Sequence, residues 1–283
     1  MKTAFIGLGA MGGPMAAHLL AKGHALCVFN RSPAKTRAWL DAHPGAAMAE
    51  TVAGVVAGAE LVALCVGNDA DVRATVQAAL PALAPGAVIV DHTTTSAELA
   101  REMSALCAPV GVAFIDAPVS GGEVGAQKGQ LTVMCGGDAA AFERVQPVLM
   151  SYAKAVTLLG GSGSGQLAKM VNQICIAGLV QGLAEALAFG ERAGLDMPRV
   201  LDVIGKGAAQ SWQMEQRGAT MLRDEFDFGF AVDWMRKDLG LVLDESRRNG
   251  AKLPVTAVVD QFYSEVQASG GNRFDTSSLI TRL

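Results

Sequence analysis

The sequence predicts an α/β protein, with a doubly wound, mainly parallel sheet in its N-terminal half and an all-α domain in its C-terminal half. In the first half, short apolar runs of strand length alternate with amphipathic helical segments, the pattern of right-handed βαβ crossovers. After the stretch "GGSGSG" at residues 160–165, only helical periodicity remains. A content of 51% hydrophobic and 18% charged residues over 283 positions is typical of well-buried globular domains.

Six apolar runs in the first half have the length of strands: residues 3–7, 25–29, 61–66, 87–91, 113–117 and 131–135. The run "LVALCV" at 61–66 contains no polar residue, which fits a central strand covered on both faces. Helical patterns in the second half cover residues 166–193, a segment beginning near Met197, and residues 211–222, 231–249 and 255–268. We therefore expect domains at residues 1–162 and 163–283, the second of them helical.

Charge and cysteine content restrict the classes of partner. A net charge of −4 with no run of Lys or Arg argues against nucleic-acid and membrane-surface partners. The five cysteines are scattered without a CxxC pair, so we expect reduced core residues and no metal site. The longest apolar stretch, 174–190, is interrupted by Gln181 and Glu185, and glycines interrupt the N-terminal one, so neither a membrane span nor an export signal is expected. These observations predict a cytoplasmic protein.

The glycine-rich stretch "FIGLGAMGG" closes the first expected strand and opens a helix. Gly7, Gly9 and Gly12 have the G-x-G-x-x-G spacing of the Rossmann dinucleotide-binding turn. In that turn the first glycine permits the bend, the second lets a pyrophosphate approach, and the third lets the helix pack on the strand. A glycine turn that binds nothing is the alternative. The residues expected to contact the cofactor here are Gly7, Leu8, Gly9, Ala10, Met11 and Gly12.

The end of the second strand reads "VFNRSPAK" and bears on the choice of cofactor. Asn30 stands where an acidic residue would hold the ribose 2′-hydroxyl of NAD, and Arg31, Ser32 and Lys35 follow it. A carboxylate would repel a 2′-phosphate, whereas a guanidinium can bind one with two hydrogen bonds. We therefore predict NADP(H) as the preferred cofactor, with NAD(H) as a possible one. The alternative is that Arg31 and Lys35 are only solvated surface charges.

Three further loops are expected at the carboxyl ends of the strands, where ligands bind in such sheets. The first, "CVGND", supplies Val66, Gly67 and Asn68 as expected cofactor contacts. In "VDHTTTSAE", the hydroxyl of Thr94 could contact the nicotinamide part of the cofactor, and Thr95 or Ser96 could equally be a helix N-cap.

The third loop, "IDAPVSGGEVG", contains Ser120, Gly121 and Gly122 after a proline-stiffened turn. Such a loop can direct successive backbone N–H groups at a small anion such as a carboxylate. An ordinary tight turn before a helix is the alternative.

The segment "GSGQLAKMVNQ" places Lys169 at the head of an apolar helix. At 100° per residue, Gly165, Lys169, Asn172 and Ile176 share one narrow arc. We expect Gly165 to leave room for a ligand beside Lys169. A surface lysine whose stem covers apolar neighbours is the alternative.

Four motifs in order, "GLGAMG", "DAPVSGG", "GQLAKMVN" and "KDLGL", resemble those of the 3-hydroxyacid dehydrogenases related to 3-hydroxyisobutyrate dehydrogenase and 6-phosphogluconate dehydrogenase. The resemblance implies a Rossmann domain linked by a long helix to a helical domain, in homodimers or homotetramers. It further implies Lys169 and Asn172 as catalytic residues, and Thr94 and Lys237 as residues near the cofactor. The implied substrate-binding residues are Ser120, Gly121, Gly122, Lys169, Asn172 and Gln173, the last of these replacing a second asparagine found in many relatives.

The implied reaction is reversible hydride transfer between NADP(H) and a short 3-hydroxy acid or semialdehyde acid, a small-molecule carboxylate. Lys169 would exchange the proton of the hydroxyl group, Asn172 would orient the substrate, and Ser120–Gly122 would hold its carboxylate. A free lysine, with a pKa of about 10.4, is a poor base at neutral pH, and burial or a nearby cation such as Lys237 would lower that pKa. The alternatives are a glyoxylate or succinic semialdehyde reductase, an imine reductase, and a non-catalytic nucleotide-binding scaffold.

Overall fold

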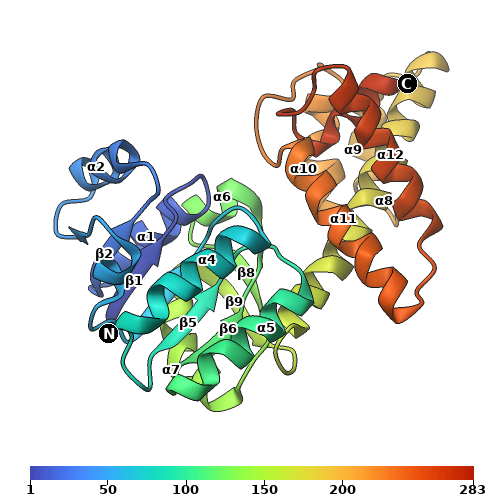
Figure 1. Ribbon diagram of the computed structural model, residues 1–283. Helices are drawn as coiled ribbons and strands as arrows, with labels where there is room; N and C mark the ends of the chain where they lie inside the picture. Colours follow the sequence, from blue (N-terminus) through green and yellow to red (C-terminus); the bar gives the residue numbers. More distant parts are fainter. The chain divides into compact units, whose positions relative to one another are not determined.

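The computed structural model describes residues 1–283, which form two compact units, Met1–Lys169 and Met170–Leu283. The division between them lies inside α8 (Ser164–Arg192), a single helix of 29 residues (Figure 1). The boundary expected from the sequence, after residue 162, falls just before this helix begins.

The first unit contains a parallel sheet of six strands in the order β3-β2-β1-β4-β5-β6. The chain order reverses beside β1, which pairs with both β2 and β4, so the crevice of a doubly wound sheet lies at the carboxyl end of β1. The strands are β1 (Lys2–Ile6), β2 (Ala25–Phe29), β3 (Ala47–Met48), β4 (Leu61–Leu64), β5 (Val88–Asp91) and β6 (Ala113–Asp116).

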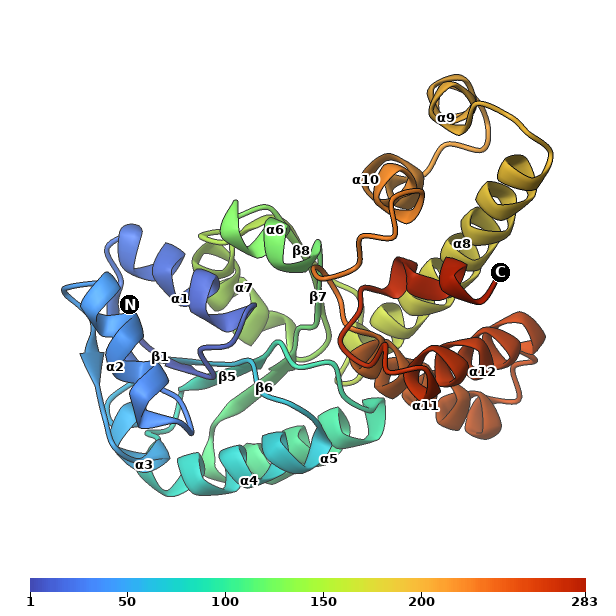
Figure 2. The same cartoon turned by 90° about the horizontal axis from the view of Figure 1, so that it is seen from above.

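Helices cover both faces of this sheet, as Figure 2 shows from above. One face carries α1 (Gly12–Ala21), α6 (Gly122–Gln127) and α7 (Ala139–Leu149), and the other carries α3 (Val52–Val56), α4 (Asp69–Ala79) and α5 (Ala97–Cys107). The remaining helices of the unit are α2 (Pro33–Ala42) and the 3-10 turns η1 (Leu80–Ala82) and η2 (Ala108–Val110).

The two faces have separate apolar cores. In β1, Phe5 belongs to the core that contains Met15 of α1, whereas Ile6 belongs to the core that contains Val72 of α4. Successive side chains of a strand point to opposite faces, so a strand buried on both sides must be apolar throughout. The same alternation explains the unbroken apolar run at residues 61–66, which contains β4: Leu61 belongs to the first of these cores and Val62 to the second.

A second, smaller sheet contains β7 (Val119–Ser120), β8 (Leu131–Cys135) and β9 (Ala153–Leu158). β8 pairs antiparallel with β7 and parallel with β9. β9 is not predicted from the sequence, because exposed polar residues such as Lys154 interrupt its apolar pattern. The two-residue strands β3 and β7 are not predicted either, since they are too short to have a pattern.

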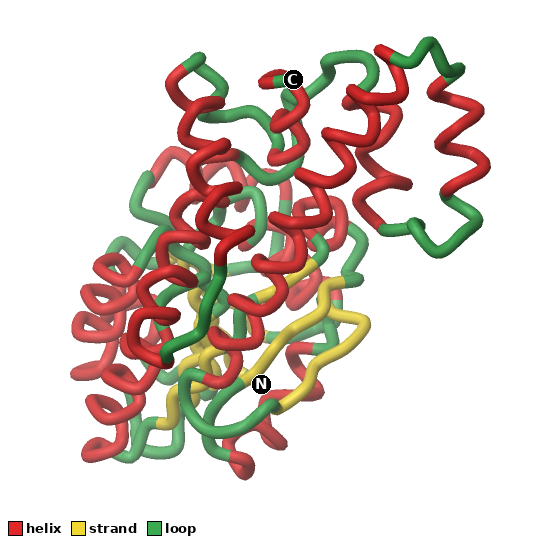
Figure 3. Tube along the Cα trace, turned by 90° about the vertical axis from the view of Figure 1, so that its right-hand side faces the viewer, coloured by secondary structure: helices red, strands yellow, loops and turns green.

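The second unit is built from helices and loops, and Figure 3 shows the strands confined to the first unit. Its core joins Val180 and Leu187 of α8 to Leu239 of α11 and Tyr263 of α12. The helices that follow α8 are α9 (Met197–Ile204), α10 (Trp212–Met221), α11 (Val232–Asn249), α12 (Pro254–Ala268) and the 3-10 helix η3 (Thr276–Arg282).

By length and composition alone, α8 is also long and apolar enough to cross a membrane, with a mean hydropathy of 1.4 over its most apolar window. Half of that window is buried inside the protein, as expected of a core helix. Length and hydropathy therefore do not distinguish a membrane-spanning helix from a buried core helix. The absence of a membrane partner stays a prediction.

Candidate active site

The glycine turn between β1 and α1 has the shape that the sequence pattern requires. A Cβ atom at Gly7 would lie 2.1 Å from the carbonyl oxygen of Cys65, and one at Gly12 would lie 1.9 Å from that of Gly7. A Cβ atom at Gly9 would have no neighbour within 4 Å, so the backbone is open to approach there. No side chain caps the N-terminus of α1, which leaves the helix end available to an anion. The turn, which extends through Leu8, Ala10 and Met11, thus fits a dinucleotide pyrophosphate.

Asn30, directly after β2, supports this turn. Its Oδ1 accepts a hydrogen bond from the backbone N–H of Leu8 at 3.0 Å, and its Nδ2 donates to the carbonyl oxygen of Ser32 at 3.4 Å. Ser32 precedes α2, and its side chain makes no capping hydrogen bond. The side chain of Arg31 is 91% exposed and lies 3.6 Å from Asp71, and Lys35 is exposed in the first turn of α2. The four residues predicted to recognise the ribose end of the cofactor are therefore gathered at the start of α2.

The loops after β4 and β5 are joined by hydrogen bonds at the same edge of the sheet. The backbone N–H of Val66, next to Gly67, donates to Thr93 Oγ1 at 3.0 Å. Asn68 caps α4, and Ser96, two residues after Thr94, caps α5 by accepting from the N–H of Leu99 at 3.0 Å. Ser96 is therefore the N-cap that the sequence left open between two residues.

Ser120, Gly121 and Gly122 form a tight turn that begins a short helix. Ser120 pairs with Thr132 across the small sheet, and α6 begins at Gly122. Gly121 has φ +126° and Gly122 has φ +61°, backbone conformations that residues with side chains rarely adopt. Both glycines are exposed, so the turn offers an open backbone surface.

Lys169 lies near the start of α8 and is only 8% exposed. It is not a surface lysine, which was the alternative interpretation of the sequence. The expectation that Gly165 leaves room for a ligand is wrong. A Cβ atom at this position would lie 2.4 Å from the carbonyl oxygen of Met134 and 2.7 Å from that of Asp116, so the glycine is required for close packing of α8 on the strand ends.

Buried polar groups that the sequence analysis did not single out lie at the ends of β5 and β6. Burial raises the pKa of Asp91 to about 7 and lowers the pKa of His92 to about 4. His92 Nδ1 lies 2.7 Å from the carbonyl oxygen of Ala117, and its Nε2 lies 2.8 Å from the hydroxyl of Tyr152. A neutral imidazole satisfies both contacts if Nδ1–H donates to the carbonyl and Nε2 accepts from the hydroxyl. His92 and Tyr152 thus form a neutral, buried pair that supports the strand ends.

In the second unit, a chain of side-chain contacts joins the predicted residues of α8 and α11. Asn172 Nδ2 donates to Gln173 Oε1 at 2.8 Å, and Gln173 Nε2 donates to Asp238 Oδ2 at 2.7 Å. The other carboxylate oxygen of Asp238 forms no well-aligned hydrogen bond but lies 3.2 Å from Lys237 Nζ, an ion pair. Gln173 and Asp238 are each 2% exposed. Gln173, predicted to bind substrate, is thus placed as a bridge between Asn172 and Asp238, and the sequence analysis missed Asp238.

Two family models together match nearly the whole chain. One, described as the NAD binding domain of 6-phosphogluconate dehydrogenase, matches residues 2–161. The other, described as the NAD-binding domain of NADP-dependent 3-hydroxyisobutyrate dehydrogenase, matches residues 163–283. The chain belongs to the 3-hydroxyisobutyrate dehydrogenase family.

Relatives and solved structures agree with this family. A 2-hydroxy-3-oxopropionate reductase of Escherichia coli is 35% identical over 100% of this chain and 97% of its own length. A protein of Shewanella frigidimarina, named an uncharacterized oxidoreductase, is 57% identical over 100% of this chain and 98% of its own. The 3-hydroxyisobutyrate dehydrogenase of Mycobacterium tuberculosis, solved with L-serine, has a TM-score of 0.91 and 32% identity, covering 99% of this chain and 98% of that one.

Membership of the 3-hydroxyisobutyrate dehydrogenase family fixes the general chemistry. The protein is an oxidoreductase with a Rossmann sheet, an NAD(P)-dependent 3-hydroxyacid dehydrogenase of the 3-hydroxyisobutyrate dehydrogenase type. Its relatives act on small-molecule substrates. The expected fold, an α/β unit followed by an all-α region on a long helix, is confirmed.

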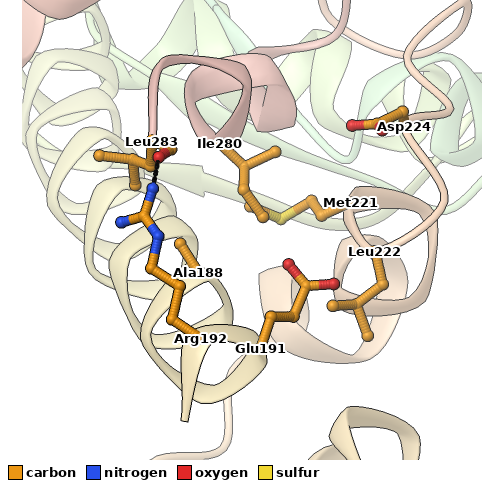
Figure 4. Close-up of a pocket in the computed structure, with 8 residues that line it drawn as sticks. All are labelled: Ala188, Glu191, Arg192, Met221, Leu222, Asp224, Ile280 and Leu283. Carbon is orange, nitrogen blue, oxygen red and sulfur yellow. Dashed lines mark hydrogen bonds between the residues drawn. The ribbon is translucent and has the colours of Figure 1, made fainter. Parts of the chain in front are cut away.

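A cavity in the second unit lies apart from the residues singled out by the family motifs. It is formed by the C-terminal end of α8, by α10 and by η3, and Figure 4 shows its lining. Arg192 donates a hydrogen bond to the backbone oxygen of Leu283. None of the residues that line this cavity belongs to the predicted site.

Proposed function

We propose that this protein is an NADP(H)-dependent enzyme that interconverts a short 3-hydroxy acid and the corresponding semialdehyde acid, with Lys169 as the general acid and base. The observation that carries the proposal is the burial of Lys169 at the start of α8, with 8% of its surface exposed. Membership of the 3-hydroxyisobutyrate dehydrogenase family supplies the reaction class, and we assign the proton exchange of that reaction to this buried lysine.

The residues of the first unit would hold the cofactor at the carboxyl edge of the sheet. The turn Gly7–Gly12 and the uncapped start of α1 would bind the pyrophosphate, and the loops containing Val66–Asn68 and Thr94 would lie along the nicotinamide half. Lys237 stays a predicted cofactor contact. When bound, NADPH supplies the hydride that reduces the substrate carbonyl carbon.

The chain's own side chains would manage the proton and the substrate. In reduction, the Lys169 ammonium donates a proton to the carbonyl oxygen, and the resulting neutral amine regains one from solvent. In oxidation, the neutral amine takes the hydroxyl proton. Asn172 would orient the reacting oxygen, and the backbone of Ser120–Gly122 would bind the carboxylate. Gln173 would act on the substrate through its hydrogen bond to Asn172.

The preference for NADP(H) over NAD(H) rests on the start of α2. There is no carboxylate at position 30, and Arg31 and Lys35 present exposed cations beside a helix N-terminus whose cap residue, Ser32, makes no side-chain capping bond. A 2′-phosphate would gain charge-assisted hydrogen bonds there. The match to a family model described as NADP-dependent supports the same choice.

The substrate class is supported by what the relatives are named for. L-serine, present with the mycobacterial structure, is itself a 3-hydroxy acid, and the Escherichia coli relative is named for reducing a semialdehyde acid. Glyoxylate and succinic semialdehyde present the same pairing of carbonyl and carboxylate and are the second candidate class.

A homodimer or homotetramer is part of the proposal, and we expect it to cover one face of α8. Val171, Cys175, Leu179 and Phe189 project from this face, and the side chains of Val171 and Phe189 are 62% and 73% exposed. Gly182, between them, has open space where a side chain would be. A monomeric protein in light scattering, or an unchanged mass in Phe189→Glu, would contradict this part. We further propose a cytoplasmic location, with neither nucleic acid nor membrane as partner.

Steady-state kinetics over a panel of small acids tests the proposed function. The purified protein should reduce methylmalonate, tartronate or succinic semialdehyde or glyoxylate with NADPH, at a higher kcat/KM than with NADH. The substrate with the highest kcat/KM identifies the acid. Turnover only of imines, or cofactor binding without turnover of any member, would contradict the proposal.

A further inference from the structure

The start of α8 is fixed by a buried carboxylate at the end of β6. Asp116 has no exposed surface, and its Oδ1 accepts a hydrogen bond from the backbone N–H of Gly163 at 2.7 Å. Its Oδ2 accepts from the N–H of Gln166 at 2.9 Å. Backbone N–H groups in the first turn of a helix have no partner within the helix, and a negative charge is favoured there. Asp116 therefore caps α8 from outside the helix.

Two glycines bring the carboxylate and the helix into close contact. The backbones of Asp116 and Gly136 exchange hydrogen bonds of 3.0 and 2.8 Å. A Cβ atom at Gly136 would lie 2.7 Å from Asp116 Oδ1, and one at Gly165 would lie 2.9 Å from Asp116 Oδ2. Neither position tolerates a side chain, so the helix start, the end of β6 and the end of β8 meet with little freedom to shift.

Gln166 adds a second connection, to the loop after β5. This side chain is fully buried, its Oε1 accepts from the N–H of Thr95 at 3.0 Å, and its Nε2 donates to the carbonyl oxygen of Thr93 at 2.7 Å. The same loop contains Thr94, a predicted cofactor contact. Lys169 follows Gln166 by three residues, close to one helical turn.

We propose that Asp116 and Gln166 are positioning residues that hold the Lys169 ammonium at a fixed place relative to the nucleotide-binding loops. Asp116 sets the position of the first turn of α8 along the strand ends, and Gln166 sets its rotation against the Thr93–Thr95 loop. This inference rests on the proposed function, because Lys169 is the reacting group there. It gives a structural reason for the aspartate of "DAPVSGG" and the glutamine of "GQLAKMVN", neither of which is placed to react.

Hydrogen exchange tests whether Asp116 holds the start of α8, and it does not require any activity. In Asp116→Asn, one acceptor oxygen becomes an amide donor facing a backbone N–H, so the amides of residues 163–169 should exchange at least about tenfold faster than in the wild type. Asp138→Asn is the matched control, because Asp138 caps a different helix, α7, by accepting from the backbone N–H of Ala141 at 2.8 Å, and it makes none of the contacts described at the start of α8. It should leave the exchange of these amides unchanged. Gln166→Leu, which retains the carboxylate cap, serves as a second variant should Asp116→Asn not fold.

Steady-state kinetics then test whether Asp116 and Gln166 act through Lys169. Misplacement of a reacting group by about 1 Å can lower a rate about 100-fold, so kcat should fall about 10- to 100-fold in Asp116→Asn or Gln166→Leu. The Kd for NADPH should stay within about twofold of the wild-type value. In a Lys169→Ala background, the same substitutions should lower the remaining kcat by less than about threefold, because the group they position is gone.

Unchanged exchange at residues 163–169, or an equal loss of kcat in the presence and absence of Lys169, would overturn the positioning role. A parallel loss of NADPH affinity would also overturn it, by indicating general damage to the nucleotide site. If the wild-type protein reduces no member of the panel, the proposed function fails, and the exchange experiment still decides whether Asp116 holds α8.

Discussion

The two units hold their parts of α8 in different ways. In the first unit, the carboxylate of Asp116 binds backbone N–H groups of the helix, and the nearby turns are also held through backbone atoms, as in the bond from Leu8 N–H to Asn30. In the second unit, the carboxylate of Asp238 binds only side chains, those of Gln173 and Lys237. Both carboxylates are buried.

This difference indicates which parts of the site can vary. A contact to backbone survives most changes in the helix sequence, so the position of Lys169 depends on few residues. A contact between side chains changes whenever either partner changes, so the orientation of Asn172 depends on the glutamine at position 173. We expect the first unit to fix the chemistry and the second to adjust the fit of the substrate.

The largest effect should come from removing the group that the backbone contacts position. Lys169→Ala should lower kcat about 100- to 10,000-fold, the range of general acid–base catalysis, because no other proton donor replaces the ammonium. The Kd for NADPH, measured by fluorescence titration, should change little. A variant that keeps more than a tenth of the wild-type kcat would remove Lys169 from the mechanism.

Removal of the Arg31 side chain should have the next largest effect on the kinetics. Arg31 offers the cofactor an exposed side chain, whereas most of the predicted cofactor site is formed by backbone groups. Arg31→Ala should raise the KM for NADPH about tenfold or more, through loss of a charge-assisted contact to the 2′-phosphate. The KM for NADH should stay near its wild-type value. Arg37→Ala, an exposed arginine on α2, the helix that begins two residues after Arg31, is the matched control and should affect neither. Equal changes with both cofactors would refute the phosphate contact.

Removal of the side-chain bridge in the second unit should have a smaller effect. Gln173→Leu removes the amide that joins Asn172 to Asp238, so Asn172 loses a hydrogen-bond partner that orients it, and kcat/KM for the acid substrate should fall about tenfold. Gln181→Leu is the matched control, since Gln181 is also buried on α8 and bonds Glu185. It should leave kcat/KM unchanged. Identical kinetics in the two variants would mean that the bridge supports only the fold.

Much of the first unit's arrangement could be predicted from its sequence, and less of the second unit's. The glycine turn was predictable because its backbone shape restricts residues 7 and 12 to glycine, and a local pattern records that restriction. Asp116 and Asp238 were missed because their partners lie far along the chain and follow no period. Gly165 was misinterpreted for the same reason: its packing against Met134 depends on a strand that the helical pattern does not reveal.

The smallest effect concerns the buried carboxylate beside Asp116. Burial raises the pKa of Asp91 to about 7, so between pH 4 and 7 the folded protein holds a proton that the unfolded chain has released. This contribution to stability is present at low pH and is lost as the pH rises through about 7. His92, with its pKa lowered to about 4, acts in the opposite direction, since its contribution is lost as the pH falls below about 6.5.

In Asp91→Asn only the histidine contribution of this pair remains. From pH 5 to pH 7, the unfolding free energy of this variant, measured by urea denaturation, should therefore rise relative to the wild type, by about 1–3 kcal/mol. A pH dependence parallel to that of the wild type would show that the Asp91 carboxyl does not titrate in this range.

Chemical rescue of Lys169→Ala tests the central assignment most directly. Small primary amines such as methylamine should restore part of kcat for semialdehyde reduction in this variant. The restored rate should increase with the concentration of the ammonium form, because Lys169 acts as a proton donor in that direction. Rescue that follows the free amine, or no rescue by any amine small enough to enter the site, would contradict the role of Lys169 as the general acid.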